Sequence, residues 1–139
     1  MTNVMHLKRY SPAHLENIKL RKCYENEGPF TVGDLAITLM LGEDVMAIFG
    51  GDFLNGKTLK LWALISEEAT KWPLSLHRFA KILLKYAFKT FHIHRAQMSV
   101  RCDFATGWRW AKVLGFECEG IMKRYGQDGS NYWMFARTL

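Results

Sequence analysis

Aromatic and basic side chains alternate in one short stretch, Trp108-Arg109-Trp110-Ala111-Lys112. Single-stranded nucleic acids bind to such mixtures, because bases stack on the rings and basic groups attract the phosphates. On a helix, however, these five residues spread over several faces, which predicts one indole in the core and the other partly exposed. No recognised nucleic-acid motif accompanies the stretch. Nucleic acid is therefore a weak choice among anionic partners.

Metal and disulfide chemistry find little support in the sequence. His92 and His94 would place two imidazoles on one face of a strand, which suits zinc. No third and fourth ligand is evident, so we interpret the pair as the turn between a helix and a strand. The cysteines are odd in number and widely spaced, and predict structural thiols in a reducing compartment: Cys23, Cys102 and Cys118.

Basic residues outnumber acidic ones, with 19 Lys and Arg against 13 Asp and Glu and a formal charge of +6. This balance favours anionic partners, such as CoA, a nucleic acid or an acidic protein, without choosing among them. One face of a predicted helix carries four of the cations: Arg78, Lys81, Lys85 and Lys89. Such a row is either an anion-binding surface or an ordinary solvated face.

The length of 139 residues predicts a single domain over residues 1–139. The composition, 49% hydrophobic and 23% charged, is typical of a globular protein. No apolar run approaches the roughly 18 residues of a membrane span, and the first 20 residues lack the apolar core of a signal peptide. We therefore expect a soluble intracellular protein without a membrane span.

The elements that position these residues follow from hydrophobic periodicity. Residues 4–10 alternate like a strand, and Ser11-Pro12 opens a short helix. Three more strands follow at short intervals, at 35–41, 45–54 and 58–66. Gly50-Gly51, inside the second of these, predicts a bulge or a close backbone approach.

The second half predicts a long amphipathic helix that begins at Pro73 and ends at Phe91. The remaining elements are a strand, a short helix and a final hairpin, at 94–101, 106–114, 117–125 and 132–138. A right-handed crossover would make the strands on either side of the long helix parallel neighbours. The predicted class is α+β, an α/β sandwich with a mixed, mostly antiparallel sheet and helices on both faces.

This order of elements resembles the GNAT (Gcn5-related N-acetyltransferase) superfamily. The best local match is a strand ending in R-A-Q-M-S-V, followed by a short helix, Leu114-Gly115-Phe116 and a hairpin. The resemblance covers essentially the whole chain and implies a GNAT-like acyl-CoA N-acyltransferase fold with acetyl-CoA as cofactor. The phrases VMAIFGG, LWALIS, LLKYAF and KVLGF also look like the GNAT-like podophage proteins known as internal virion protein A, in which the acetyltransferase motif is eroded.

The resemblance implies a cofactor site at a strand end and a helix start: Leu64, Ile65, Ser66, Arg78, Phe79, Ala80 and Lys81. In the superfamily, a Q/R-x-x-G-x-G/A loop wraps the pyrophosphate with backbone N–H groups. Here the loop falls on residues 75–80, where only Ala80 agrees. Arg78 replaces a glycine, so this residue or Lys81 would have to hold the phosphates through charge. The departure weakens the expectation of acetyl-CoA binding.

The catalytic pattern of the superfamily is also incomplete. Its usual general acid, a Tyr four residues before the glycine of LGF, is replaced by Ala111, which cannot transfer a proton. Glu67 and Glu68 follow the buried strand, where a base or substrate-binding carboxylate of the superfamily lies, and are the catalytic candidates. Asp52 is a similar candidate, and all three are compatible with ordinary loop charges.

Two functions therefore stay open. The missing glycines and tyrosine favour a non-catalytic, phage-type module that is associated with the virion or binds a phage or host protein. The usual activity of the fold favours an acetyl-CoA-dependent N-acetyltransferase with a divergent pyrophosphate loop. The first is the main prediction and the second the alternative. Both are compatible with a homodimer, and with a location in the host cytoplasm or the virion.

Overall fold

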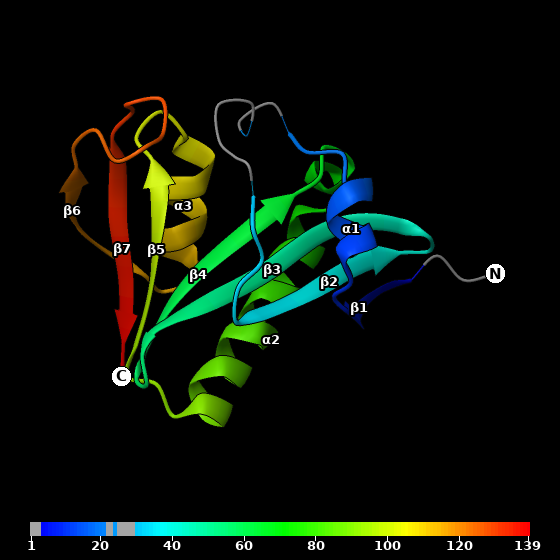
Figure 1. Cartoon of the computed structure of the whole chain (residues 1–139), viewed down its shortest axis with the longest axis horizontal. Helices are drawn as coiled ribbons and strands as arrows, with labels where there is room; N and C mark the ends of the chain where they lie inside the picture. The colour runs from blue at the N-terminus through cyan, green and yellow to red at the C-terminus, as the bar shows by residue number, and fades with distance from the viewer. Residues whose placement is uncertain (1–3, 22–23, 25–29) are drawn as a thin grey trace.

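In a computed structural model of the chain, the described residues form one seven-stranded mixed sheet with helices on both faces (Figure 1). The structure describes residues 4–21, 24 and 30–139. The elements in chain order are β1 (Met5–Arg9), α1 (Pro12–Asn17), β2 (Leu35–Leu41), β3 (Asp44–Asn55), β4 (Thr58–Ile65), the 3-10 helix η2 (Glu68–Lys71), α2 (Pro73–Phe91), β5 (Arg95–Arg101), α3 (Ala105–Val113), β6 (Glu117–Met122) and β7 (Tyr132–Thr138).

The strand order in the sheet is β1-β2-β3-β4-β5-β7-β6. All neighbouring strands are antiparallel except β4 and β5, which are parallel and joined by α2. This confirms the predicted crossover. The parallel pairing covers only three residues of each strand, 58–60 against 95–97. Beyond them β4 and β5 diverge, and the sheet opens between their carboxyl ends (Figure 1).

The long helix α2 covers the segment predicted for it. Pro73 occupies its first position, where the missing N–H costs nothing. Its buried side chains recur at helical spacing and face the sheet: Leu76, Ala80, Leu84 and Ala87. None of the helices in the described part of the chain is long and apolar enough to cross a membrane.

The core lies on both faces of the sheet. On the face covered by α2 and α3, Leu59 of β4 packs with Leu84 of α2, Ala111 of α3 and Phe135 of β7. On the α1 face, Ile18 packs against Ile48 and Leu64 of the two central strands. The central strands therefore bury side chains in both directions, which explains the nearly uniform apolar run of β4.

The two histidines lie at the predicted turn. His92 ends α2 with a left-handed φ of 52°, and Ile93 is fully buried between it and His94. No group of three or more metal-ligating side chains occurs among the described residues. Cys102 and Cys118 are free thiols, and Cys23 lies outside the described residues.

Two local predictions need correction, and one short element was not predicted. The pairing of β3 with β4 passes through Gly50 and Gly51 without a shift, so the predicted alternative of a bulge there is wrong. The close approach is right, because a Cβ on Gly50 would lie 2.1 Å from the ring of Trp62 on β4. The strand predicted at 117–125 ends at Met122, and η2 was not predicted because its four residues are too few for a periodic pattern.

Candidate active site in the cleft between β4 and β5

A cavity of about 1270 Å³ occupies the opening between the diverging strands, and we call it the β4–β5 cleft. Strands β3, β4 and β5 line it together with α2 and α3. Among its described lining residues Asp52 is the sole carboxylate, against four Lys and Arg side chains, of which Arg101 is paired with Asp103 and Asp128: Arg21, Lys60, Arg101 and Arg109. This excess of positive charge inside a concave site favours an anionic ligand.

The edge of β4 inside the cleft carries backbone groups that no strand pairs. The Ser66 N–H donates to the Met46 carbonyl on β3 at 2.9 Å. Because backbone groups alternate in direction along a strand, the Ile65 N–H and the Ala63 carbonyl face the cleft. The Tyr24 hydroxyl bridges them, accepting from the Ile65 N–H and donating to the Ala63 carbonyl, each at 3.1 Å.

The loop between β6 and β7 brings Tyr125 to the cleft and is held by charge. Arg101 of β5 donates to Asp128 at 3.2 Å and to Asp103 at 3.1 Å. Hydrogen bonds from Ser130, followed by the contact with Arg101, lower the pKa of Asp128 to about 2. The hydrogen bond with Arg101 also lowers the pKa of Asp103, so both carboxylates stay ionised at neutral pH. The pair of Arg101 with Asp128 ties the β6–β7 loop to β5.

The aromatic and basic side chains of residues 108–112 lie on α3, and some of them pack in the core while others line the cleft. Trp108 packs edge-on against Trp133 and Phe135, with ring centroids 5.3 and 5.0 Å away. Trp110 donates its indole N–H to His77 of α2 at 3.3 Å, and Arg109 lines the cleft. The two indoles thus make separate contacts and offer no common stacking platform for bases.

No protein-family model matches the chain, and no curated protein matches it. Solved structures match its fold along nearly all of its length. A GNAT-family acetyltransferase from Bacillus anthracis has a TM-score of 0.77 at 15% identity, covering 96% of this chain and 94% of that chain. Ard1 from Thermoplasma volcanium has a TM-score of 0.77 at 14% identity, covering 97% of each chain. The chain has the GNAT fold.

A third structure with the GNAT fold gives the same picture. A ribosomal-protein alanine acetyltransferase from Vibrio fischeri has a TM-score of 0.78 at 11% identity, covering 99% of this chain and 94% of that chain. At such low identities the similarity shows the fold alone. What this chain does must be argued from its own cleft.

The segment aligned with the pyrophosphate loop does not form a backbone cradle. Helix α2 begins before Ser75, and the Leu76 N–H already donates to the Trp72 carbonyl at 3.0 Å. The next four amides lie inside the helix, where each N–H bonds to the carbonyl four residues earlier. They cannot also point at a phosphate. The amides of residues 76–80 therefore provide no backbone cradle for a phosphate.

The predicted residues at the start of α2 point in different directions. Ala80 is buried and lines the cleft, and Phe79 packs on the core beside β4. Arg78 and Lys81 are exposed and lie outside the lining of the cleft. Lys81 instead borders a smaller pocket between α2, the end of α3 and the C-terminal residues, near Lys85. Arg21 and Arg109 are the arginines that line the cleft without a carboxylate contact among the described residues.

The predicted residues at the end of β4 also differ in role. Leu64 and Ile65 line the cleft. Ser66 is buried, and its hydroxyl accepts the Ala69 N–H at 3.0 Å, so it helps to form η2. Of these three residues, Ile65 is the one whose amide faces the cleft.

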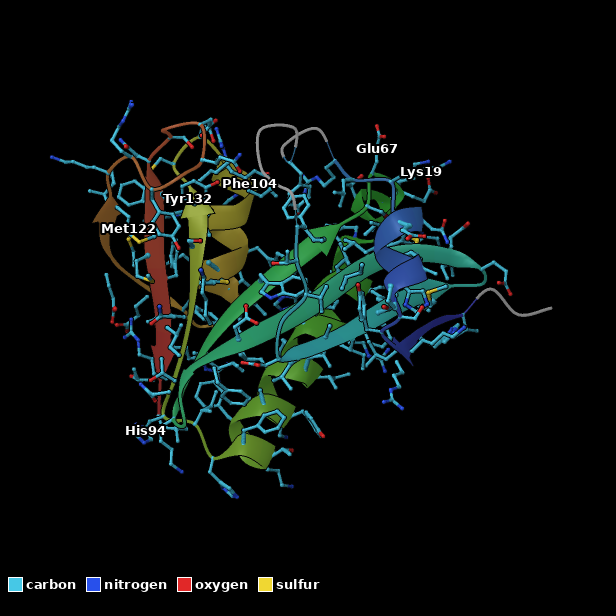
Figure 2. All side chains as sticks on the ribbon, viewed as in Figure 1. Lys19, Glu67, His94, Phe104, Met122 and Tyr132 are labelled. Atoms are coloured by element: carbon cyan, nitrogen blue, oxygen red, sulfur yellow. The ribbon has the colours of Figure 1, made fainter. Side chains whose placement is uncertain are left out.

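The three catalytic candidates have different surroundings, and only one of them lines the cleft. Glu67 projects from the end of the sheet beside Lys19, whose carbonyl accepts its N–H at 2.9 Å (Figure 2). Glu68 forms an exposed ion pair with Lys71 at 3.3 Å. Neither glutamate lines the cleft, whereas Asp52 does, with its carboxylate accepting the Asp34 N–H at 3.1 Å.

Ala111, which the resemblance drawn from the sequence sets at the position of a general acid, faces the core. It is fully buried and packs with Phe116 and Phe135 between α3 and the sheet. It does not line the cleft. A proton donor for the cleft would therefore have to come from another element.

Proposed function

We propose that this protein is an acyl-CoA-dependent N-acyltransferase that binds its thioester along β4 in the β4–β5 cleft. The observation that carries the proposal is the cleft-facing pair on β4, the Ile65 N–H and the Ala63 carbonyl. The extended arm of an acyl-CoA can add to such an edge as a further strand does, with a pantetheine amide N–H on the Ala63 carbonyl and the thioester carbonyl oxygen on the Ile65 N–H. The cationic lining suits the phosphates at the other end of the same molecule.

Catalysis in this proposal rests on position more than on acid–base groups. The acceptor nitrogen attacks the thioester carbonyl carbon, so that a C–N bond forms and the C–S bond breaks. The Ile65 N–H is placed to stabilise charge on the carbonyl oxygen. The proton that the amine loses passes to water, and the thiolate of CoA is protonated by water. Without an acid at Ala111, the reaction forgoes the roughly 10²–10⁴-fold that general acid catalysis supplies.

Side chains replace the backbone grip on the phosphates. Arg21 and Arg109 line the cleft, and a guanidinium binds phosphate through paired N–H groups. They recover only part of the several charge-assisted hydrogen bonds that a backbone cradle makes, each about 1.5–3 kcal/mol. We therefore expect a dissociation constant for acetyl-CoA no tighter than about 100 μM.

The test is release of free thiol from acetyl-CoA with a panel of amines, and mass spectrometry of the acylated products. Arg109→Ala should raise the KM for acetyl-CoA by roughly three- to tenfold with kcat unchanged, since it removes a binding contact alone. Arg78→Ala is the matched control, because it removes the same charge from an exposed position outside the cleft. Its KM should stay within about twofold of the wild type.

Absence of thiol release and of any acylated amine, at millimolar acetyl-CoA, would refute the proposed activity. Equal effects of Arg109→Ala and Arg78→Ala would refute the position of the phosphates and leave the activity standing. The two parts of the proposal therefore fail separately.

A second candidate is a non-catalytic binding module, including the virion-associated role. It draws its support from the helical hydrogen bonds of the α2 amides and from the buried Ala111. For this module we expect no thiol release with any amine. Acetyl-CoA binding alone does not distinguish the two candidates, so turnover is the deciding measurement.

A further inference from the structure

One histidine lies in the lining of the cleft, half-buried at the start of the second turn of α2. The Nδ1 atom of His77 accepts the indole N–H of Trp110 on α3 at 3.3 Å. An indole N–H can only donate, so Nδ1 presents its lone pair, and the proton of the neutral imidazole sits on Nε2. No hydrogen bond to Nε2 of His77 occurs among the described residues. This N–H is therefore left for a ligand in the cleft.

The bond to Trp110 limits what the imidazole of His77 can do. With Nδ1 occupied and Nε2 protonated, the neutral ring has no free lone pair and does not serve as a base for the amine. Loss of its single proton would leave an anionic ring, so it does not serve as a general acid either. The remaining role is that of a fixed hydrogen-bond donor, which stabilises negative charge that develops next to it.

His77 lies on the side of β4 where such charge develops in the proposed reaction. The thioester oxygen binds the Ile65 N–H and a pantetheine amide binds the Ala63 carbonyl, so the sulfur lies between these two contacts. The side chains of both residues pack in one cluster with Leu76 of α2 and Trp110 of α3. Leu76 is the chain neighbour of His77, and Trp110 is its hydrogen-bond partner. The imidazole is therefore beside this stretch of the β4 edge, in the same cleft.

From this arrangement we infer that His77 is a catalytic hydrogen-bond donor to the leaving sulfur, and that Trp110 is a positioning residue that fixes its tautomer. The inference rests on the proposed function and names a further catalytic residue for it. When the C–S bond breaks, its electron pair goes to the sulfur. The Nε2–H of His77 stabilises the thiolate that results, and the proton that the thiolate takes up comes from water.

The first test observes the ring directly, by NMR of protein labelled with ¹⁵N in its histidines. The His77 signals are identified by their loss in His77→Gln. We expect the Nε2–H tautomer in the wild type and a mixture of tautomers in Trp110→Phe, which keeps a ring but removes the N–H. Millimolar CoA should shift the Nε2 signal, whereas desulfo-CoA, which lacks the sulfur atom, should shift it several-fold less.

The second test measures the contribution of the donor to acyl transfer. His77→Ala should lower kcat for thiol release by roughly tenfold with KM unchanged, as expected for the loss of one hydrogen bond to a charged group. His77→Gln should stay within about threefold of the wild type, because its amide accepts from Trp110 through oxygen and donates through nitrogen. His94→Gln is the matched control, because His94 is exposed outside the lining of the cleft. It should change neither kcat nor the response of the Nε2 signal to CoA.

An Nδ1–H tautomer in the wild type, equal shifts with CoA and desulfo-CoA, or an unchanged kcat in His77→Ala would each overturn the inference. Equal losses of kcat in His77→Ala and His77→Gln would also overturn it, because the glutamine still donates. The NMR test needs no acyl transfer. A chain that acylates no amine, but whose Nε2 signal responds to CoA and not to desulfo-CoA, would therefore refute the activity alone and retain the contact between His77 and the sulfur.

Discussion

Replacing Ala111 with tyrosine is expected to destabilise the protein by about 1–3 kcal/mol and to leave acyl transfer no faster. Ala111 is fully buried against Phe116 and Phe135, and a ring there overfills the core. The new hydroxyl would point at the sheet and not into the cleft. The measurement is paired: the free energy of unfolding by chemical denaturation, and thiol release with the same amines.

The matched control for this change is Lys112→Tyr on the same helix. Lys112 is exposed and does not line the cleft, so the ring finds space and should change stability by less than about 0.5 kcal/mol. A tenfold rise in turnover for Ala111→Tyr with unchanged stability would contradict the account. It would mean that a side chain at position 111 reaches the reacting groups, as the resemblance drawn from the sequence implies for a tyrosine there.

Removing the hydroxyl of Tyr24 is expected to tighten acetyl-CoA binding by roughly 5- to 30-fold while lowering the stability of the free protein by about 1–2 kcal/mol. In Tyr24→Phe the Ile65 N–H and the Ala63 carbonyl lose their partner, which costs the free protein stability. The thioester arm satisfies both groups when it binds and no longer has to displace the hydroxyl. The free energy that the free protein loses with the hydroxyl is the free energy that binding no longer has to supply. The gain in binding free energy and the loss of stability should therefore be equal.

Calorimetry with acetyl-CoA and denaturation of the free protein measure these two effects. Tyr10→Phe is the control, because Tyr10 packs on the same face of the sheet and contacts His14 through its ring, with centroids 6.1 Å apart. Tyr10→Phe should change neither the affinity for acetyl-CoA nor the stability of the free protein as much as Tyr24→Phe does. A loss of acetyl-CoA affinity in Tyr24→Phe would show that the hydroxyl helps the ligand and does not compete with it.

The main elements could be predicted because local patterns determine them. Strand β2, helix α2 and strand β7 have the predicted bounds, since their periodicity is strong and Pro73 marks the start of the helix. The parallel pairing of β4 and β5 followed from the handedness of the connection. Their divergence did not, because it depends on how both strands twist and pack.

The cleft was only partly predictable. Leu64, Ile65 and Ala80 follow from the position of the strand and helix, and all three line it. Arg78 faces away from the cleft, because Leu76 and Ala80 lie on the side of α2 that packs on the sheet and Arg78 lies on the opposite side. The orientation of Arg78 could therefore have been predicted from the helical periodicity of the sequence.

The roles of other cleft residues could not be predicted from local sequence patterns. Tyr24 reaches Ala63 across 39 positions of the chain, and its role depends on an edge that exists only in the folded sheet. The hydrogen bond between Trp110 and His77 is likewise a property of three-dimensional packing. The pairing of Trp62 with Gly50 was accessible in principle, because a glycine inside a strand indicates close approach of a neighbour.

The most direct test of the account follows the backbone amides of β4 by NMR while acetyl-CoA is added. The account predicts that the Ile65 amide signal moves, because its N–H faces the cleft, while the Ser66 amide, which donates to Met46 on β3, moves several-fold less. An unmoved Ile65 signal at millimolar acetyl-CoA would contradict the proposed cleft. So would shifts confined to the residues around Lys81 and Lys85 of α2, which would mean that the phosphates bind only to these exposed basic side chains.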